Sequence, residues 1–288
     1  MSDSEKNNII TMEFFDLLSY SFFQNALLGS LFASIACGII GSYVVIRRLV
    51  FISGGITHAS LGGIGMGFYF GWNPILSAMI FSILSAFGIE WLSSRQGVRE
   101  DSAIGSFWSL GMAVGIIFIY LKPGFAPNLS DYLFGNILTI TKPDIIYLAV
   151  LSLVLIIVFL LFGRQILFAA FDPDFAKTRN LSVNLIKYAM MMGIAITIVL
   201  SIRLVGIVLL MSILTVPQMT ANLFTSNFVK MILLSILIGF LGCLVGLFLS
   251  AVLDVPSGVF IIFTQIIVFL ISRWIVKLIH KKQLIGSL

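Results

Sequence analysis

Residues 51–70 read FISGGITHASLGGIGMGFYF, and this stretch decides what kind of fold the chain can adopt. It contains no Asp, Glu, Lys or Arg, and most of its residues are apolar or glycine. A run of about 20 such residues has the length that an α-helix needs to cross the hydrocarbon core of a bilayer. Because a backbone surrounded by lipid must satisfy its own hydrogen bonds, the stretch predicts a transmembrane helix.

The composition of the whole chain agrees with this prediction. Of 288 residues, 59% are hydrophobic and 10% are charged, whereas a soluble domain carries roughly 25% charged residues. A soluble globule of this size would lack the polar side chains to cover its surface, so we expect membrane lipid to surround most of the chain. We therefore predict an all-α polytopic membrane protein in which residues 1–288 form a single transmembrane domain.

Nine apolar runs are long enough to be transmembrane helices. They are residues 26–46, 51–70, 75–92, 102–121, 145–162, 188–202, 204–224, 231–253 and 259–276. The break at Arg203 is short, and one long bent helix there would reduce the number of spans to eight. Residues 1–24 include a short aromatic run that also contains Asp16, and we expect this segment to lie along the membrane interface.

Basic residues indicate the direction of the spans. When Arg47 and Arg48 are placed inside the cell, strict alternation puts thirteen of the 17 Lys and Arg residues inside and four outside. Cytoplasmic loops of membrane proteins carry an excess of these residues. The bias predicts an N-terminus outside and a C-terminus inside. The net charge of +5 is explained by this topology, and no nucleic-acid partner is expected.

Glycine and proline interrupt two of the runs. The run quoted above contains six glycines from Gly54 to Gly67, which either let neighbouring helices approach closely or let the helix break. The run at 204–224 contains Pro217, followed by Gln218. Because a proline in mid-helix leaves a carbonyl without its donor, it indicates either a discontinuous helix that lines a cavity or a packed kink.

His58 is the one side chain within the run quoted above whose unperturbed pKa lies near neutral pH. An ionisable group at membrane depth is a functional candidate, because it is unfavourable there unless it is paired or hydrated. Neutral imidazole is a common metal ligand and can act as a proton switch. The alternative is a histidine held by the hydroxyl of a neighbour such as Thr57 or Ser60. The candidates for lining a transport pathway beside His58 are Thr57, Ser60, Pro217 and Gln218.

The longest predicted cytoplasmic segment spans residues 164–187. It contains Phe171, Asp172, Pro173, Asp174, Phe175 and Ala176 in succession. Asp172 is suited to cap a short helix whose first turn holds Pro173 and Asp174, and the two phenylalanines are apolar anchors on either side. The segment is either a simple connector or a coupling element that docks into a groove on a soluble partner.

Motifs for catalysis are missing from the sequence. It contains no Walker phosphate loop, no Gly-x-Ser-x-Gly and no His-Glu-x-x-His, which are the patterns of common nucleotide and hydrolase sites. We therefore expect the chain not to be an enzyme. If it transports a substrate uphill, the energy comes from elsewhere.

Several motifs, in order along the chain, resemble the permease subunits of metal-ion ABC importers, the branch that carries zinc, manganese and iron. They are residues 53–62 (SGGITHASLG), 99–105 (REDSAIG), 132–138 (YLFGNIL), 171–176 (FDPDFA), 205–221 and 254–258 (DVPSG). The first is similar to the family's second-helix signature, and the segment at 171–176 is similar to the loop that contacts the ATPase. Together the motifs cover nearly the whole chain.

The resemblance implies an all-helical permease in the cytoplasmic (inner) membrane of a bacterium. It implies a second permease copy, two cytoplasmic ATPase subunits and an extracytoplasmic metal-binding protein as partners. ATPase closure would be transmitted through residues 171–176 and would switch the permease pair from outward-facing to inward-facing. The cargo would be a divalent metal ion, with no permanently bound cofactor, and His58 matches the family's pathway histidine.

The chain departs from the family at Gly54. Members of the family usually carry an aspartate at this position, one helical turn before the histidine, where the two side chains form a ligand pair. A turn without its carboxylate has less charge to hold a divalent cation. Thr57, water or the second permease copy could compensate.

Two other functions remain alternatives. A secondary transporter driven by an ion or proton gradient usually has acidic or basic relays at mid-membrane, where this chain has only His58, and it needs no capped cytoplasmic helix. An ABC permease for a metal chelate is left open by the missing carboxylate at Gly54.

Overall fold

A computed structural model describes residues 19–123, 137–253 and 255–286, and all of the regular secondary structure in these ranges is helical. The elements are α2 (Ser21–Ile46), α3 (Val50–Phe70), α4 (Pro74–Gln96), α5 (Glu100–Leu121), the 3₁₀ helix η1 (Ile137–Thr139), α7 (Lys142–Phe171), α8 (Pro173–Thr178), α9 (Val183–Ile213), α10 (Val216–Phe224), α11 (Phe228–Leu253) and α12 (Ser257–Gly286). The predicted all-α class is confirmed.

Eight segments of the described chain are long and apolar enough to cross a membrane. They coincide with eight of the nine predicted spans, with Val183–Ile202 and Val205–Phe224 counted separately. The remaining predicted span, residues 51–70, forms α3. This helix has 21 residues but is less apolar than the other spans because of its glycines and His58. Most residues of α3 are buried, mainly against α5 and α4, so this helix does not need an apolar surface toward lipid.

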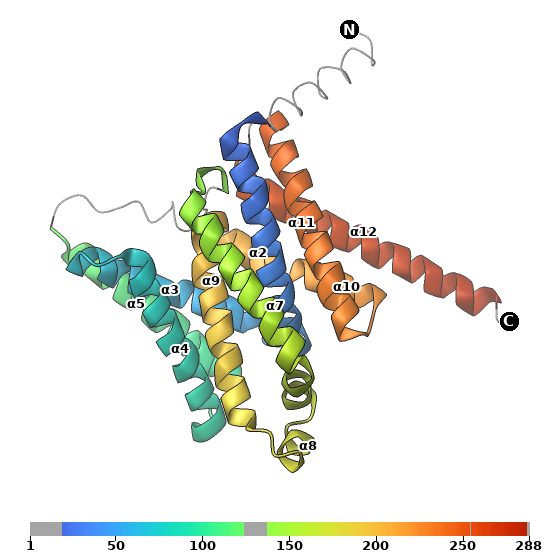
Figure 1. Ribbon diagram of the computed structural model, residues 1–288, viewed down its shortest axis with the longest axis horizontal. Helices are drawn as coiled ribbons and strands as arrows, with labels where there is room; N and C mark the ends of the chain where they lie inside the picture. Colours follow the sequence, from blue (N-terminus) through green and yellow to red (C-terminus); the bar gives the residue numbers. More distant parts are fainter. Residues whose placement is uncertain (1–18, 124–136, 254, 287–288) are drawn as a thin grey trace, which may run out of the picture.

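Figure 1 shows three groups of helices side by side. Helices α3, α4 and α5 lie together on one side, α2, α7 and α9 occupy the centre, and α10, α11 and α12 lie on the other side. The short helix α8 lies at the end of the bundle where α7 ends. We call this the basic end, because it also holds Arg47 at the end of α2 and Lys187 near the start of α9.

Local sequence signals set several helix ends. The Asn73 side chain accepts hydrogen bonds at 3.0 and 3.4 Å from two backbone N–H groups in the first turn of α4, which also holds Pro74. An Asn cap followed by Pro is a common start of a helix. Helices α3 and α4 end at Gly71 and Gly97, whose φ angles are 72° and 68°. Glycine adopts this left-handed conformation without steric strain.

The glycines of α3 bring its backbone against two neighbouring helices. A Cβ atom at Gly67 would lie 2.8 Å from Cα of Pro74 in α4, and one at Gly62 would lie 2.9 Å from the carbonyl oxygen of Gly111 in α5. Only residues without a side chain permit so close an approach. Because α3 is also continuous, the close-packing interpretation is confirmed, and the alternative of a broken helix is wrong here.

The predicted span at 204–224 is interrupted twice. Gly206 has φ 72° and ψ 169° inside α9, and residues 214–215 separate α9 from α10. The sequence predicted a boundary between two spans at Arg203, with one long bent helix as the alternative. The interruption lies instead at Gly206 within α9, where glycine tolerates a positive φ. Of the two interpretations of Pro217, the helix break is observed, whereas the lining of a cavity stays a prediction. This proline lies in the first turn of α10, where its missing N–H group has no partner to lose.

The predicted cytoplasmic segment 164–187 contains more helix than expected. Helix α7 continues to Phe171 instead of ending at residue 162, and α9 begins at Val183. The apolar run ends where basic residues begin, but helical structure continues until Pro173, which cannot donate a backbone hydrogen bond.

Parts of three predicted segments lie outside the described residues. Residues 1–18 of the expected interfacial segment are among them, whereas residues 21–24 belong to α2. The motif at 132–138 is described only from residue 137 onward, and the motif at 254–258 from residue 255 onward.

Candidate functional site

His58 lies on α3, half-buried, with its ring against α5. The imidazole stacks on the indole of Trp108 with the ring centroids 4.3 Å apart and the planes at 9°. The indole is held in turn, because its Nε1–H donates to Sδ of Met112 at 3.2 Å. Nδ1 of His58 is buried and has no hydrogen-bond partner among the described residues. The ring is therefore held by stacking, and its Nδ1 atom makes no hydrogen bond to the described residues.

Thr57 and Ser60 do not hold His58. Both are fully buried, the Thr57 hydroxyl donates to the carbonyl of Ser53, and the Ser60 hydroxyl donates to the carbonyl of Thr57 at 2.6 Å. These are bonds within α3 itself, of the kind that serine and threonine commonly make in helices. The interpretation of His58 as a histidine bound by either hydroxyl is not supported, and a role of these two residues in a pathway stays a prediction.

The space over Gly54, one turn before His58, is filled from two other helices. A Cβ atom at Gly54 would lie 2.8 Å from Cε and 3.6 Å from Sδ of Met211 in α9, and 3.2 Å from Cζ3 of Trp108. A carboxylate at this position would collide with the methionine unless that side chain moved. The position that holds an aspartate in the resembling family is here packed with a thioether and an indole.

Pro217 and Gln218 lie just after the helix break, where Gln218 contacts α2 and Pro217 packs against Gly239 of α11. The Gln218 amide donates from Nε2 to the carbonyls of Cys37 and Ile213, at 2.8 and 3.1 Å. It thus satisfies a carbonyl at the end of α9 and ties α10 to α2, where Gly41 leaves room for the amide. The structure does not bring this pair to His58, and no contact described here tests the predicted pathway role.

Helix α8 has the capped geometry that the sequence predicts. The Asp172 carboxylate accepts from the backbone N–H of Phe175 at 2.9 Å, and Pro173 and Asp174 occupy the first turn. Lys177 lies 2.9 Å from Asp174, and its hydrogen bond and charge lower the pKa of that exposed carboxyl. Ala176 is buried against Ala169 of α7 and Val183 of α9, so α8 is fixed to the bundle.

The two phenylalanines beside α8 differ in their surroundings. Phe171 is 67% exposed, whereas Phe175 is 44% exposed and packs edge-on against Phe168 with the ring centroids 5.4 Å apart. Phe171 therefore presents its ring outward, and Phe175 presents only part of it. Of the two predicted anchors, Phe171 is the one better placed to insert into another protein.

Arg47 and a buried ion pair connect the basic end of the bundle. Arg47 Nη1 donates to the carbonyl of Ala170 at 3.0 Å, two residues before the cap of α8. Lys187 of α9 lies 3.7 Å from the carboxylate of Glu90 in α4, which is 5% exposed. These contacts join α2 to α7 and α9 to α4 at the end of the bundle that holds α8.

Trp108, Met211 and the Arg47 contact were not found from the sequence. Trp108 and Met112 are four residues apart, a spacing that puts them on one helix face, but this does not reveal which helix that face meets. Met211 is separated from Gly54 by more than 150 residues, and only the packing of α9 on α3 brings them together.

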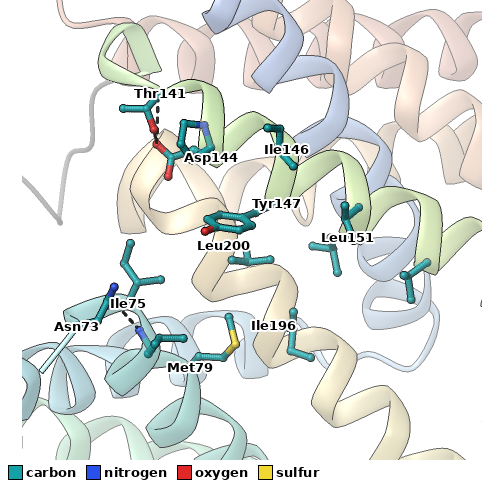
Figure 2. A pocket seen from close by; sticks show the side chains of 14 residues that line it. Asn73, Ile75, Met79, Thr141, Asp144, Ile146, Tyr147, Leu151, Ile196 and Leu200 are labelled. Atoms are coloured by element: carbon teal, nitrogen blue, oxygen red, sulfur yellow. Dashed lines mark hydrogen bonds between the residues drawn. The ribbon is translucent and has the colours of Figure 1, made fainter.

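Figure 2 shows a separate pocket of about 1020 Å³ between α4, α7 and α9. Its lining is mostly apolar, with Met79, Tyr147 and Leu200 among the side chains, and it includes no residue of α3. The Asp144 carboxylate at its rim accepts from the backbone N–H of Thr141 at 3.1 Å and is part of the capping box of α7. The pocket is thus suited to apolar groups rather than to a cation.

The described residues contain no group of three or more His, Cys, Asp or Glu side chains that could hold a metal ion. This agrees with the sequence, in which the carboxylate expected beside His58 is replaced by Gly54.

Comparisons with known proteins find similarity along most of the chain. Residues 19–276 match the ABC 3 transport family. An uncharacterized membrane protein of Synechocystis sp., slr2045, is 40% identical over 255 residues, which cover 88% of this chain and 91% of that protein. The manganese import system permease protein ScaB of Streptococcus parasanguinis is 32% identical over 264 residues, which cover 91% of this chain and 94% of that protein. In the solved structure of PsaBC from Streptococcus pneumoniae in complex with Fab, one chain superposes with a TM-score of 0.81 at 30% identity, covering 91% of this chain and 95% of that chain.

Proposed function

The chain belongs to the ABC 3 transport family, and from this premise we propose that it is the permease subunit of an ATP-driven importer of divalent metal ions. Zinc, manganese and iron are the cargo candidates. The metal is a substrate that passes through, not a resident cofactor. A relative named as a manganese import permease supports the direction of transport and the class of cargo.

The observation that supports a metal cargo is that His58 is held by stacking and has a ring nitrogen without a hydrogen-bond partner among the described residues. Its Nδ1 atom is buried without a partner in the described residues, and its ring is held by Trp108. A buried polar atom is unfavourable unless something binds it, and neutral imidazole is a frequent ligand of transition metals. A positioned histidine nitrogen inside a membrane helix is suited to hold a cation briefly during transport.

Three partners follow from this proposal. A pair of ATPase subunits would dock at the basic end, where α8 presents Phe171, and would hydrolyse ATP, so that the permease itself is not an enzyme. A metal-binding protein would deliver cargo at the opposite end. A second copy of this chain would complete the transporter as a homodimer, because most oligomers of one chain have closed symmetry.

The orientation in the bacterial inner membrane is part of the proposal. The basic end carries Arg47, Lys187 and α8, and thirteen of 17 Lys and Arg residues fall on the same side when the spans alternate. By the positive-inside rule, the basic end faces the cytoplasm, with the N-terminus outside and the C-terminus inside.

Single-cysteine labelling tests this orientation. The native Cys37 and Cys243 are buried, so an impermeant maleimide should report mainly on introduced residues. We expect Lys142→Cys, at the exposed start of α7, to react in intact cells. We expect Asp174→Cys, whose side chain position is 90% exposed in α8, to react only after the membrane is opened. Labelling of Asp174→Cys in intact cells would reverse the orientation.

The function itself is tested by transport in a reconstituted system. The permease, co-expressed with a candidate partner ATPase and a candidate metal-binding protein, should accumulate radioactive zinc, manganese or iron in proteoliposomes only when ATP is supplied. An ATPase variant that binds but cannot hydrolyse ATP is the control. Accumulation driven by a pH or sodium gradient without ATP would favour a secondary transporter, and uptake only of a chelated metal would favour a chelate permease.

A further inference from the structure

The surroundings of His58 contain a second atom that can bind a metal. Residues four apart on a helix have Cβ atoms about 5–6 Å from each other, so the positions of Gly54 and His58 share one face of α3. Sδ of Met211 lies 3.6 Å from the place of a Cβ at Gly54. The thioether of Met211 therefore lies against α3 one turn before His58, on the face of α3 that Trp108 also covers.

Carboxylates in the described residues lie elsewhere. Glu90 is paired with Lys187 in the last two turns of α4. The others lie in the first turns of helices or at the cap of α8: Glu100, Asp101, Asp144, Asp172 and Asp174. The site therefore lacks a carboxylate among the described residues, and the side-chain donors on this face of α3 include an imidazole nitrogen and a thioether sulfur, both neutral.

We propose that Met211 is a second cargo donor beside His58, and that the permease therefore prefers borderline or soft cations, with zinc as the representative, over manganese. Imidazole and thioether ligands suit softer transition metals, whereas manganese favours carboxylate, carbonyl and water oxygens. This inference rests on the proposed function and specifies its site. It separates this chain from a relative that is named for manganese, although the two are similar along most of their length.

The shape of the site supports the same preference. The Trp108 indole covers one face of the His58 ring and closes on the space over Gly54, and its Nε1–H is already bonded to Met112. This wall offers a cation no oxygen ligand. A hard ion such as manganese would lose hydration there without gaining oxygen donors, whereas a softer ion gains nitrogen and sulfur.

The test compares zinc and manganese uptake by the whole complex in proteoliposomes. Met211→Leu removes the sulfur and keeps nearly the same volume, and Met231→Leu does the same at a buried methionine of α11 that is 1% exposed. We expect the wild type to prefer zinc in competition. Met211→Leu should raise the KM for zinc about tenfold, which corresponds to about 1.4 kcal/mol, and leave the KM for manganese unchanged. Met231→Leu should behave as wild type.

A double variant provides the converse measurement. Gly54→Asp alone would meet Met211, but Gly54→Asp combined with Met211→Ala frees the space for a carboxylate. The pair should shift the preference toward manganese.

A wild type that prefers manganese, or a Met211→Leu variant with equal effects on both metals, would overturn the inference while leaving the importer intact. ATP-dependent uptake of neither metal by the wild type would instead overturn the proposed function. If the double variant does not assemble, the Met211→Leu result decides alone.

Discussion

Replacing His58 with alanine should reduce ATP-driven uptake of every transported metal by at least about 100-fold. Loss of a group that only orients a metal ligand typically costs 10–100-fold in affinity or activity, so loss of the donor itself should cost no less. His58 is the one histidine within α3. The described residues contain no cluster of three or more His, Cys, Asp or Glu side chains that could bind the metal in its place. Met211 alone would then face the cargo with a weak neutral sulfur.

The measurement is initial uptake of zinc, manganese and iron by proteoliposomes that contain the assembled complex. His58→Gln is the second variant, because glutamine fills similar space with a neutral side chain that is a poor ligand for these metals. His280→Ala removes the chain's only other histidine and should leave uptake unchanged. Size-exclusion chromatography shows whether each variant assembles.

The stack on Trp108 makes this test informative. If His58 served only to pack against the indole, His58→Phe would restore the aromatic contact and uptake with it. If the imidazole binds cargo, His58→Phe should remain as inactive as His58→Ala. Normal uptake by an assembled His58→Ala complex would remove His58 from the pathway altogether.

The sequence was most informative where one short segment determines the structure. The spans follow from hydropathy, because a lipid-exposed backbone has no alternative to the helix. The cap of α8 follows from Asp172 and Pro173, which act within four residues of chain. The crowding of glycines in α3 predicted close contact, although two interpretations stayed open until Gly62 and Gly67 were seen against α5 and α4.

The parts that the sequence did not predict depend on contacts between distant residues. Trp108 on α5 stacks on His58, and Met211 on α9 covers Gly54 one turn before it. No local pattern indicates that these helices meet at Gly54. The predicted boundary between two spans fell at Arg203, three residues before the interruption at Gly206, because a charge is conspicuous in an apolar run whereas one glycine among many is not. One histidine in the sequence thus indicates that a site exists, but the side chains that surround it depend on how distant helices pack.

Replacing Phe171 with alanine should weaken binding of the ATPase to the permease about tenfold or more. A large apolar side chain buried at an interface typically contributes about 1–3 kcal/mol, and 1.4 kcal/mol corresponds to a factor of ten. Phe171 is 67% exposed at the end of α7 and stands directly before the capped helix, so its ring is available to fill a pocket on a partner. Phe175→Ala should have a smaller effect on the interface, because that ring is partly occupied by Phe168.

Phe162→Ala provides the matched control for this measurement. Phe162 lies on the same helix and is 51% exposed, but it belongs to the predicted membrane span, where lipid rather than the ATPase would cover it. Co-purification of the ATPase and metal-stimulated ATP hydrolysis should both fall for Phe171→Ala and stay at the wild-type level for Phe162→Ala, with equal amounts of permease in the membrane. The hydrogen bond from Arg47 to the carbonyl of Ala170, next to Phe171, does not involve the Phe171 ring. The Phe171→Ala substitution should therefore lower ATPase binding and ATP hydrolysis before it lowers the stability of the permease. Equal ATPase recovery and equal uptake for the two variants would mean that the segment around α8 only connects α7 to α9.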